Sequence, residues 1–256
     1  MSIALIGSTG LIGGTICAQT EVQATYNSKD IANIRGRSFD TVFCAGARAV
    51  KWKANQQPEV DIAEIQSLIQ NLKTIETGMF VLISTVDVYQ NPAGVDEFSP
   101  VNTHGLEPYG LHRYILEQFV RQRFPAVRIV RLPGVFGKGL KKNLIYDLMN
   151  GNALQLMNSE SRFQFYNLEN LFRDLQIVLE NSAPLVNLTV EPVRAAELAE
   201  RAFGIPFRND NGRPPAAYDM RSRFAQLFGK PGPYMYTAEE TYEDVARLVR
   251  SMEVGA

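Results

Sequence analysis

Short apolar runs alternate with helical patterns over the first 135 residues of the chain. Apolar runs rich in β-branched residues and bounded by turn residues predict strands at 3–6, 22–26, 41–45, 80–84 and 127–132. Several of these runs are apolar on both faces, which is typical of strands covered by helices on both sides. The alternation of strands and helices therefore predicts an α/β domain built on a parallel sheet.

Two helices of this half each show one apolar face at helical spacing. One face consists of Ile62, Ile65, Leu68, Ile69 and Leu72, and the other of Leu111, Ile115, Leu116, Phe119 and Val120. After Leu132 the pattern loosens, and shorter helices are predicted near 143–149, 168–179, 193–203, 220–228 and 238–252. We expect a first domain over 1–135, to which some later segments return, and a small α+β lobe formed mainly by 136–256.

Composition narrows the class of protein. With 256 residues, of which 45% are hydrophobic and 21% charged, the chain can bury a sizeable core. A formal net charge of −1 and a pI of about 6.2, without a basic run, argue against a nucleic-acid partner. Neither a membrane-spanning run nor a signal peptide is recognisable, so we expect a cytoplasmic protein. Cys17 and Cys44 are interpreted as small buried hydrophobes, and the two cysteines and two histidines show no metal-ligand spacing.

A glycine-rich loop follows the first predicted strand directly and opens a helix. Its sequence is Gly7-Ser8-Thr9-Gly10-Leu11-Ile12-Gly13. A helix N-terminus in this position presents free backbone N–H groups and a positive dipole end, both suited to a pyrophosphate. Gly7 allows the tight turn, Gly10 the approach of the phosphates, and Gly13 close packing of helix on strand. The loop therefore predicts a dinucleotide-binding Rossmann fold with a doubly wound parallel sheet.

The end of the second strand bears on the choice of dinucleotide. NAD-binding sites of this type usually carry a carboxylate there, to bond the adenosine ribose. Here the stretch 25–29 contains Asn27, Ser28 and Lys29 and no carboxylate. These residues can bond and neutralise a 2′-phosphate, so NADP is favoured and NAD stays open. Ala45 and Gly46, at the end of the third strand, complete the predicted cofactor-binding set.

Four segments together resemble the extended branch of the short-chain dehydrogenase/reductase superfamily, the nucleotide-sugar epimerases, dehydratases and reductases. They are the glycine loop 7–13, Ile83-Ser84-Thr85-Val86-Asp87-Val88-Tyr89, Tyr109-Gly110-Leu111-His112-Arg113, and Arg131-Leu132-Pro133-Gly134-Val135-Phe136-Gly137. The 24-residue step from Thr85 to Tyr109 matches the family's spacing between its hydroxyl residue and its tyrosine. The similarity is spread over most of the chain.

The resemblance implies catalytic roles for Thr85, Tyr109 and Arg113. A carbonyl that accepts hydride becomes an alkoxide, which needs a proton donor and a second hydroxyl to hold it. Tyr109 is expected to be the acid/base and Thr85 the second donor. Arg113 stands where the family has lysine, and with Tyr109 it is expected to contact the cofactor and lower the phenol pKa. His112 is interpreted chiefly as a packing residue, with a proton-carrying role left open.

Further positions concern the substrate, which the resemblance implies is a small molecule, a nucleotide sugar. Asp87 is expected either to contact it or to cap a turn, and the pair Val86-Asp87 argues against dehydration because the family's dehydratases have two acids there. Asn143 and Lys141 are expected near the nucleotide diphosphate. Gly134 replaces an asparagine common in the family, which leaves the sugar open.

Two hypotheses follow. The first is an NADP-dependent reductase or epimerase acting on a sugar nucleotide or a related keto or hydroxy compound, with a compact, reductase-like lobe. The second is a catalytically impaired dinucleotide sensor or regulatory protein of the same fold, in which Arg113 marks lost chemistry. The predicted helix 59–75 is polar away from its apolar face, which leaves monomer and homodimer both open.

Overall fold

The computed structural model describes residues 2–253, which form two compact units. The first unit contains the chain up to Gln90, Ser99–Arg131 and Leu171–Val186. The second contains Asn91–Phe98, Leu132–Asn170 and the chain from Asn187 onward. Neither unit is therefore a single stretch of sequence, and residues 91–98 and 171–186 lie outside the unit that surrounds them in the chain.

The first unit is built on a six-stranded sheet with the order β10-β6-β4-β3-β1-β2. Its strands are β1 (Ile3–Ile6), β2 (Ala24–Tyr26), β3 (Ser38–Cys44), β4 (Glu76–Thr85), β6 (Val127–Leu132) and β10 (Leu185–Asn187). The pairings β1–β2, β1–β3 and β3–β4 are parallel, with Ala4 of β1 opposite Ala24 on one side and Val42 on the other. All five predicted strands are present, and the predicted bounds of β1 and β6 are those of the structure.

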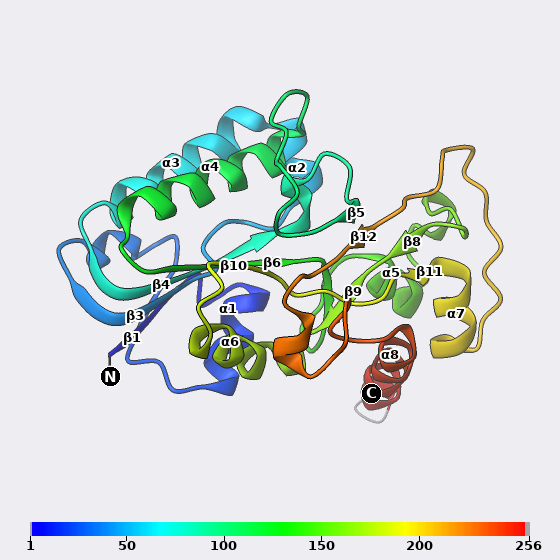
Figure 1. The fold of residues 1–256 in the computed structure, drawn as a ribbon. Coiled ribbons are helices and arrows are strands. Elements are labelled where there is room, and N and C mark those ends of the chain that lie inside the picture. The colour runs from blue at the N-terminus through cyan, green and yellow to red at the C-terminus, as the bar shows by residue number, and fades with distance from the viewer. Residues whose placement is uncertain (1, 254–256) are drawn as a thin grey trace. The chain divides into compact units, whose positions relative to one another are not determined.

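Helices cover both faces of this sheet (Figure 1). Helices α3 (Pro58–Leu72) and α4 (Pro108–Arg123) lie over one face, and α1 (Leu11–Gln19) and α6 (Leu171–Glu180) over the other. A short helix α2 (Lys51–Gln56) precedes α3, and short 3-10 turns η1 (Ile31–Ile34), η2 (Val86–Val88) and η4 (Leu168–Asn170) connect the longer elements. The two-sided cover confirms the doubly wound Rossmann architecture expected from the sequence.

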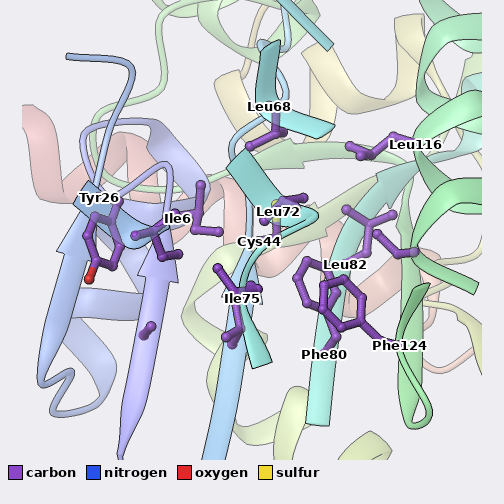
Figure 2. Close-up of a cluster of buried hydrophobic side chains, with 14 of the residues drawn as sticks. Ile6, Tyr26, Cys44, Leu68, Leu72, Ile75, Phe80, Leu82, Leu116 and Phe124 are labelled. Carbon is purple, nitrogen blue, oxygen red and sulfur yellow. The ribbon is translucent and has the colours of Figure 1, made fainter. Parts of the chain in front are cut away.

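The core between the sheet and α3 and α4 explains why these helices form where they do (Figure 2). Leu68 and Leu72 of α3 and Leu116 of α4 face the buried side chains of the central strands. Phe80 of β4 stacks on Phe124, just after α4, with ring centroids 4.4 Å apart and planes 8° from parallel. Burying a side chain of this size stabilises the fold by about 1.5–3 kcal/mol relative to leaving it exposed.

A buried ion pair joins α4 to the sheet. Arg131 of β6 donates to both carboxylate oxygens of Glu117, at 2.9 and 2.6 Å, and the two residues are 2% and 0% exposed. Ser84 of β4 donates to the same carboxylate at 2.6 Å, and Arg131 also donates to the Tyr89 hydroxyl at 2.7 Å. These bonds satisfy the buried charges, which would otherwise cost several kcal/mol each.

The strand order reverses at β1, which has β2 on one side and β3 on the other. In open α/β sheets, ligands bind outside the carboxyl ends of the strands at such a switch point. The glycine loop follows β1, and Ala45 and Gly46 follow β3. The sheet topology thus brings two sequence-distant parts of the predicted cofactor site to one edge.

The second unit contains three two-stranded sheets and three helices. Strands β8 (Arg162–Phe163) and β11 (Val193–Arg194) pair antiparallel, whereas β5 (Ala93–Val95) with β12 (Asp219–Met220) and β7 (Gly134–Phe136) with β9 (Phe165–Asn167) pair parallel. Its helices are α5 (Leu144–Asn150), α7 (Ala195–Phe203) and α8 (Ala238–Glu253), and its short 3-10 turns among the described residues are η3 (Leu154–Leu156), η4 and η5 (Ala225–Phe228). Its core joins Phe136, Ile145, Leu198 and Val245.

The predicted helix at 220–228 is wrong. The backbone of Met220 is bonded instead to the side chain of Gln164, with its N–H donating to Oε1 and its carbonyl accepting from Nε2, both at 2.7 Å. Ser222 donates its N–H to the Pro233 carbonyl at 2.9 Å. These tertiary bonds use the backbone groups that a helix needs, so only the short η5 turn forms.

Cys17 is a second correction, because it is exposed, whereas Cys44 is buried as predicted. Helix α1 buries Gly13 and Ile16, and the side chain one residue further on leaves the helix in another direction. The helical pattern therefore identified the element but assigned Cys17 to the wrong face.

Candidate functional site

The glycine loop has the tight geometry that its sequence predicts. Gly7 has φ +90°, and a Cβ added there would lie 2.4 Å from the Ala45 carbonyl oxygen. A Cβ on Gly13 would lie 2.1 Å from the Gly7 carbonyl oxygen. Both glycines are thus required by the chain itself, one by backbone conformation and close approach and the other by the packing of α1 on the turn.

Gly10 differs from its two neighbours in the motif, and it tests whether the loop suits a dinucleotide. A Cβ on Gly10 would meet only the Gly7 carbonyl oxygen, at 3.4 Å, so the chain itself leaves room for a side chain there. Gly10 is the N-cap of α1, is exposed, and places no side-chain cap on the first-turn N–H groups. Bare backbone donors at a helix start fit the pyrophosphate of a nicotinamide dinucleotide.

The turn that follows β2 contains a carboxylate, Asp30, one residue beyond the stretch 25–29. Asp30 accepts from the Asn27 backbone N–H at 2.6 Å and from its side-chain amide at 2.9 Å. The Asn27 side-chain oxygen accepts from the Lys29 backbone N–H at 2.9 Å. Asn27 therefore holds the turn together, whereas Ser28 and Lys29 are exposed. Of the three predicted contacts with a 2′-phosphate, Ser28 and Lys29 are therefore the two that solvent can reach.

Tyr109 lies in the first turn of α4. The N-cap residue of this helix, Glu107, makes no side-chain cap bond. Asn55 of α2 takes its place, because its Oδ1 accepts from the Tyr109 backbone N–H at 2.9 Å. A Cβ on the next residue, Gly110, would lie 1.9 Å from the Asp87 carbonyl oxygen. The missing side chain at Gly110 lets α4 approach η2 closely, and this approach brings Tyr109 to Thr85.

Thr85 ends β4 and caps η2, accepting the Asp87 N–H at 3.2 Å. Its hydroxyl donates to Oδ2 of Asp87 at 3.3 Å, and it lies near enough to Tyr109 to lower the pKa of the phenol. The other oxygen of Asp87 pairs with the Lys51 ammonium of α2 at 2.6 Å. Of the two roles considered for Asp87, capping the turn falls to Thr85, and the Asp87 carboxylate forms an ion pair beside the hydroxyl.

Arg113 lies one helical turn after Tyr109 and is 4% exposed. Its guanidinium donates to Oδ2 of Asp61 in α3, to the Arg48 carbonyl oxygen, and to the Tyr109 carbonyl oxygen at 3.3 Å, while its Nε has no hydrogen-bond partner among the described residues. It also stacks over the Tyr109 ring, with Cζ 4.1 Å from the centroid. Arg113 is thus held between α3 and α4.

Asp61 also bonds His112, whose Nδ1 lies 2.7 Å from its Oδ2. Burial raises the pKa of the Asp61 carboxyl, but the hydrogen bonds and charges of Arg113 and His112 outweigh it and leave this pKa below the ordinary value. The packing interpretation of His112 agrees with its burial, and its ring serves the same carboxylate as Arg113. Asp61 therefore balances much of the charge that Arg113 brings to the helix.

The expected lowering of the Tyr109 pKa is wrong for this structure. Burial raises the pKa of the phenol most strongly, and the Asp87 charge raises it further. The charges of Arg113 and Lys51 and the Thr85 hydrogen bond lower it, but they do not compensate. Tyr109 is consequently protonated at neutral pH.

In the second unit, Asn143 serves the backbone. Its side-chain oxygen accepts from the N–H groups of Ile145 and Tyr146 at 3.0 and 3.2 Å, and its amide donates to the Val135 carbonyl at 2.9 Å. Asn143 is therefore the N-cap of α5, and its amide is already occupied. Lys141 is exposed. It stays a predicted substrate contact.

Gly134 also has a local reason in this unit. A Cβ on this residue would lie 2.9 Å from the Gln164 carbonyl oxygen, where β7 pairs with β9. The family asparagine would therefore not fit this strand pairing without a shift of β9.

Four residues that shape the site were missed by sequence reasoning: Asp30, Lys51, Asn55 and Asp61. Asp30 could have been found by extending the second-strand turn by one residue. Lys51, Asn55 and Asp61 lie on helices without a motif, and only the packing of α2 and α3 against α4 brings them to Tyr109 and Arg113. Of the described residues, none form a cluster of His, Cys, Asp and Glu suited to a metal ion.

Comparison with known proteins supports the fold through structure alone, because no family model and no curated protein sequence matches the chain. The structure of MoeE5 in complex with UDP-glucose and NAD has a TM-score of 0.74 at 14% identity, covering 100% of this chain and 99% of that chain. A UDP-N-acetylglucosamine 4-epimerase from Methanobrevibacter ruminantium M1, in complex with UDP-N-acetylmuramic acid, has a TM-score of 0.75 at 14% identity, with the same coverage. The chain therefore shares the fold of these nucleotide-sugar enzymes.

A third solved structure with this fold is a dTDP-4-dehydrorhamnose reductase from Bacillus anthracis str. Ames in complex with NADP. Its TM-score is 0.72 at 16% identity, and the match covers 98% of this chain and 99% of that chain. The likeness therefore extends over both units and not only over the six-stranded sheet. Among residues 2–253, no helix combines the length and apolar character needed to cross a membrane.

Proposed function

We propose that this protein is a nucleotide-sugar oxidoreductase that binds a nicotinamide dinucleotide at the Gly7–Gly13 loop and uses Tyr109 as its acid. The observation that carries the proposal is the close approach of α4 to η2 at Gly110, which brings Tyr109 beside Thr85 at the carboxyl end of β4, in the same unit as a glycine loop with room for phosphates. Bound in this loop, the dinucleotide would supply the hydride. Tyr109 would then donate the proton, and Thr85 would hold the substrate oxygen.

Reduction is the direction that the site favours. A phenol with a raised pKa is protonated at neutral pH, which is the form needed to protonate an alkoxide. Epimerisation would also need the deprotonated phenol in its oxidation step. Asp87 stays a predicted contact of the sugar.

For the cofactor we propose NADP over NAD, on the basis of exposed Ser28 and Lys29 at the end of β2. The nearby Asp30 carboxylate opposes a 2′-phosphate by charge. Lys29→Ala should therefore weaken NADPH more than NADH, and Asp30→Asn should strengthen NADPH, both measured by isothermal titration. Gly10→Ala is the control for the loop, because its Cβ should weaken the binding of both dinucleotides.

The decisive experiment is turnover. NADPH oxidation is followed with UDP- and dTDP-linked 4-keto sugars, and Tyr109→Phe should lower kcat at least about a hundredfold, the low end for loss of a general acid. Its affinity for NADPH should change little, because the phenol oxygen serves the substrate. A Tyr109→Phe variant that turns over at the unmodified rate would show that another group is the acid.

A dinucleotide sensor is the second candidate, and the position of Arg113 favours it. Arg113 is tied to Asp61 and to the Arg48 carbonyl oxygen, so its guanidinium is less free to serve a ribose than a lysine ammonium would be. A sensor would bind NADPH as tightly as the enzyme but would oxidise it with none of the keto sugars. Tight NADPH binding without turnover across the whole substrate panel therefore selects the sensor.

A further inference from the structure

The Thr85–Tyr109 pair has a second cation beside it, on an element that no motif of the chain includes. Lys51 opens α2, and its Nζ lies 2.6 Å from Oδ1 of Asp87. The other Asp87 oxygen accepts from the Thr85 hydroxyl at 3.3 Å. Gly110 packs on the Asp87 carbonyl, and Asn55 of α2 accepts from the Tyr109 N–H at 2.9 Å, so Asp87 and α2 both lie beside the start of α4. A continuous set of polar contacts therefore leads from Thr85 to a Lys51 ammonium whose side chain is 44% exposed.

Arg113, the other cation near Tyr109, is less suited to this task. Its NH1 and NH2 groups are bonded to Asp61 and to the Arg48 carbonyl oxygen, and its side chain is 4% exposed. A guanidinium also keeps its proton at every accessible pH, whereas an ammonium can lose its proton. Lys51 is the more solvent-accessible of the two charges.

We propose that Lys51 is a positioning residue for the acid of this site: its ammonium fixes the Asp87 carboxylate that holds the Thr85 hydroxyl, and so balances the negative charge beside Tyr109. The inference rests on the proposed role of Tyr109. Without the ammonium, the Asp87 carboxylate keeps its charge beside Thr85 and Tyr109 but loses the counter-charge of Lys51, which favours the protonated phenol. With the ammonium in place, the carboxylate charge is largely balanced.

The charged groups that face Tyr109 come from three elements packed around it. Asp87 lies at η2, Lys51 on α2, and Arg113 on α4 itself, with Asp61 of α3 behind Arg113. The carboxylate of Asp87 raises the pKa of Tyr109, and the ammonium of Lys51 lowers it. Lys51 and Asp87 thus change the pKa of Tyr109 in opposite directions, so removing each charge should shift this pKa in an opposite direction.

The test titrates Tyr109 in the intact protein by NMR with tyrosine labelled at the 13Cζ position, and Tyr109→Phe assigns the signal. Lys51→Met should raise the pKa of Tyr109, Asp87→Asn should lower it, and Lys51→Arg should restore the unmodified titration. Lys53→Met is the matched control, because it removes the same charge from the same helix at an exposed position. Lys51→Met should also lower kcat for NADPH oxidation about tenfold, with KM for NADPH unchanged.

The titration needs no substrate, so it separates this inference from the proposed function. If the unmodified protein reduces no keto sugar, the proposed function fails, and the titration still decides the role of Lys51. If Lys51→Met titrates like Lys53→Met, the inference is overturned whatever the turnover. Asp87→Asn decides it in the same way if Lys51→Met does not fold, since an unchanged Tyr109 titration in that variant excludes the coupling.

Discussion

At the scale of single residues, one carboxylate holds two consecutive side chains of α4. Asp61 accepts from Arg113 and His112, and all three residues are less than a tenth exposed. Removing one partner of a buried pair leaves an uncompensated charge, which costs more than the pair contributes. The substitution at 113 that departs from the family pattern is therefore tied to stability as well as to chemistry.

Arg113→Met should lower the free energy of unfolding by about 3 kcal/mol, the low end for breaking a buried pair, since His112 still serves Asp61. Urea denaturation at neutral pH measures this loss. Arg113→Lys should lose less, because an ammonium keeps the charge although it cannot span Asp61 and the Arg48 carbonyl together. The double variant Asp61→Asn with Arg113→Met should recover part of this loss, because it removes the unpaired carboxylate. If the free energy of unfolding of Arg113→Met lies within about 0.5 kcal/mol of the unmodified protein, this account is contradicted.

The raised pKa of Tyr109 predicts a loss of stability in alkali. Because the folded pKa lies above the unfolded value of about 10, the folded state binds the phenol proton more tightly. This contribution is complete below about pH 10 and is lost as the pH rises through the folded pKa, with a slope of at most about 1.4 kcal/mol per pH unit. Urea denaturation from pH 8 to 11 should show a steeper decline for the unmodified protein than for Tyr109→Phe, and parallel curves would exclude the raised pKa.

At the scale of elements, the contact of α4 with η2 positions Tyr109, the proposed acid, and Gly110 makes that contact possible. Gly110→Ala puts a Cβ 1.9 Å from a backbone oxygen of Asp87, so α4 must move away from η2. We expect a loss of about 2 kcal/mol in the free energy of unfolding, typical of overpacking, together with loss of turnover.

Gly14 provides the matched control in another helix. A Cβ there would meet only the Ser8 carbonyl oxygen, at 3.8 Å, so Gly14→Ala should stabilise α1 by roughly 0.5–1 kcal/mol through helix propensity. Equal effects of the two substitutions in urea denaturation would mean that close approach at Gly110 is not what places α4.

The sequence predicted elements best where an apolar run has turn residues at both ends, as for β1 and β6. It predicted β3 and β4 to begin too late, because their first residues, Ser38 and Glu76, are polar and are set by pairing with each other. The helix near 193–203 begins only at Ala195, since Val193 and Arg194 pair with β8. The hydrophobic pattern of a segment indicates which of its side chains are buried, whereas pairing with a distant strand cannot be recognised in the local sequence.

The candidate site divides in the same way. The glycine loop, Thr85 and Tyr109 follow from motif and spacing, and the structure brings the last two together. The residues that determine their charge, Lys51, Asp61 and Asp87, depend on how α2, α3 and η2 pack on α4. The expected lowering of the Tyr109 pKa failed for this reason: the sequence shows the arginine, but burial, which raises this pKa most, and the Asp87 charge, which raises it further, depend on packing.

At the scale of the whole molecule, the first unit needs a segment from the second half of the chain. Helix α6 and most of β10 lie in Leu171–Val186, and Phe172 of α6 contacts Phe43 of β3 edge to face, with centroids 6.2 Å apart. A fragment that ends at residue 135, the boundary expected from sequence, lacks this cover on one sheet face. It should show no cooperative thermal unfolding by circular dichroism, whereas a fragment that ends at residue 190 should show some. A cooperative transition in the shorter fragment would mean that α6 is dispensable.

The ion pair of Glu117 and Arg131 has a consequence for the order of assembly. Each partner is brought by a different element, α4 or β6, and each is almost completely buried once docked. An intermediate with only one of these elements in place would leave a lone charge against apolar side chains, a state that is strongly disfavoured. Docking of the helix and of the strand must then occur as one event, so the pair makes half-built forms of this sheet short-lived.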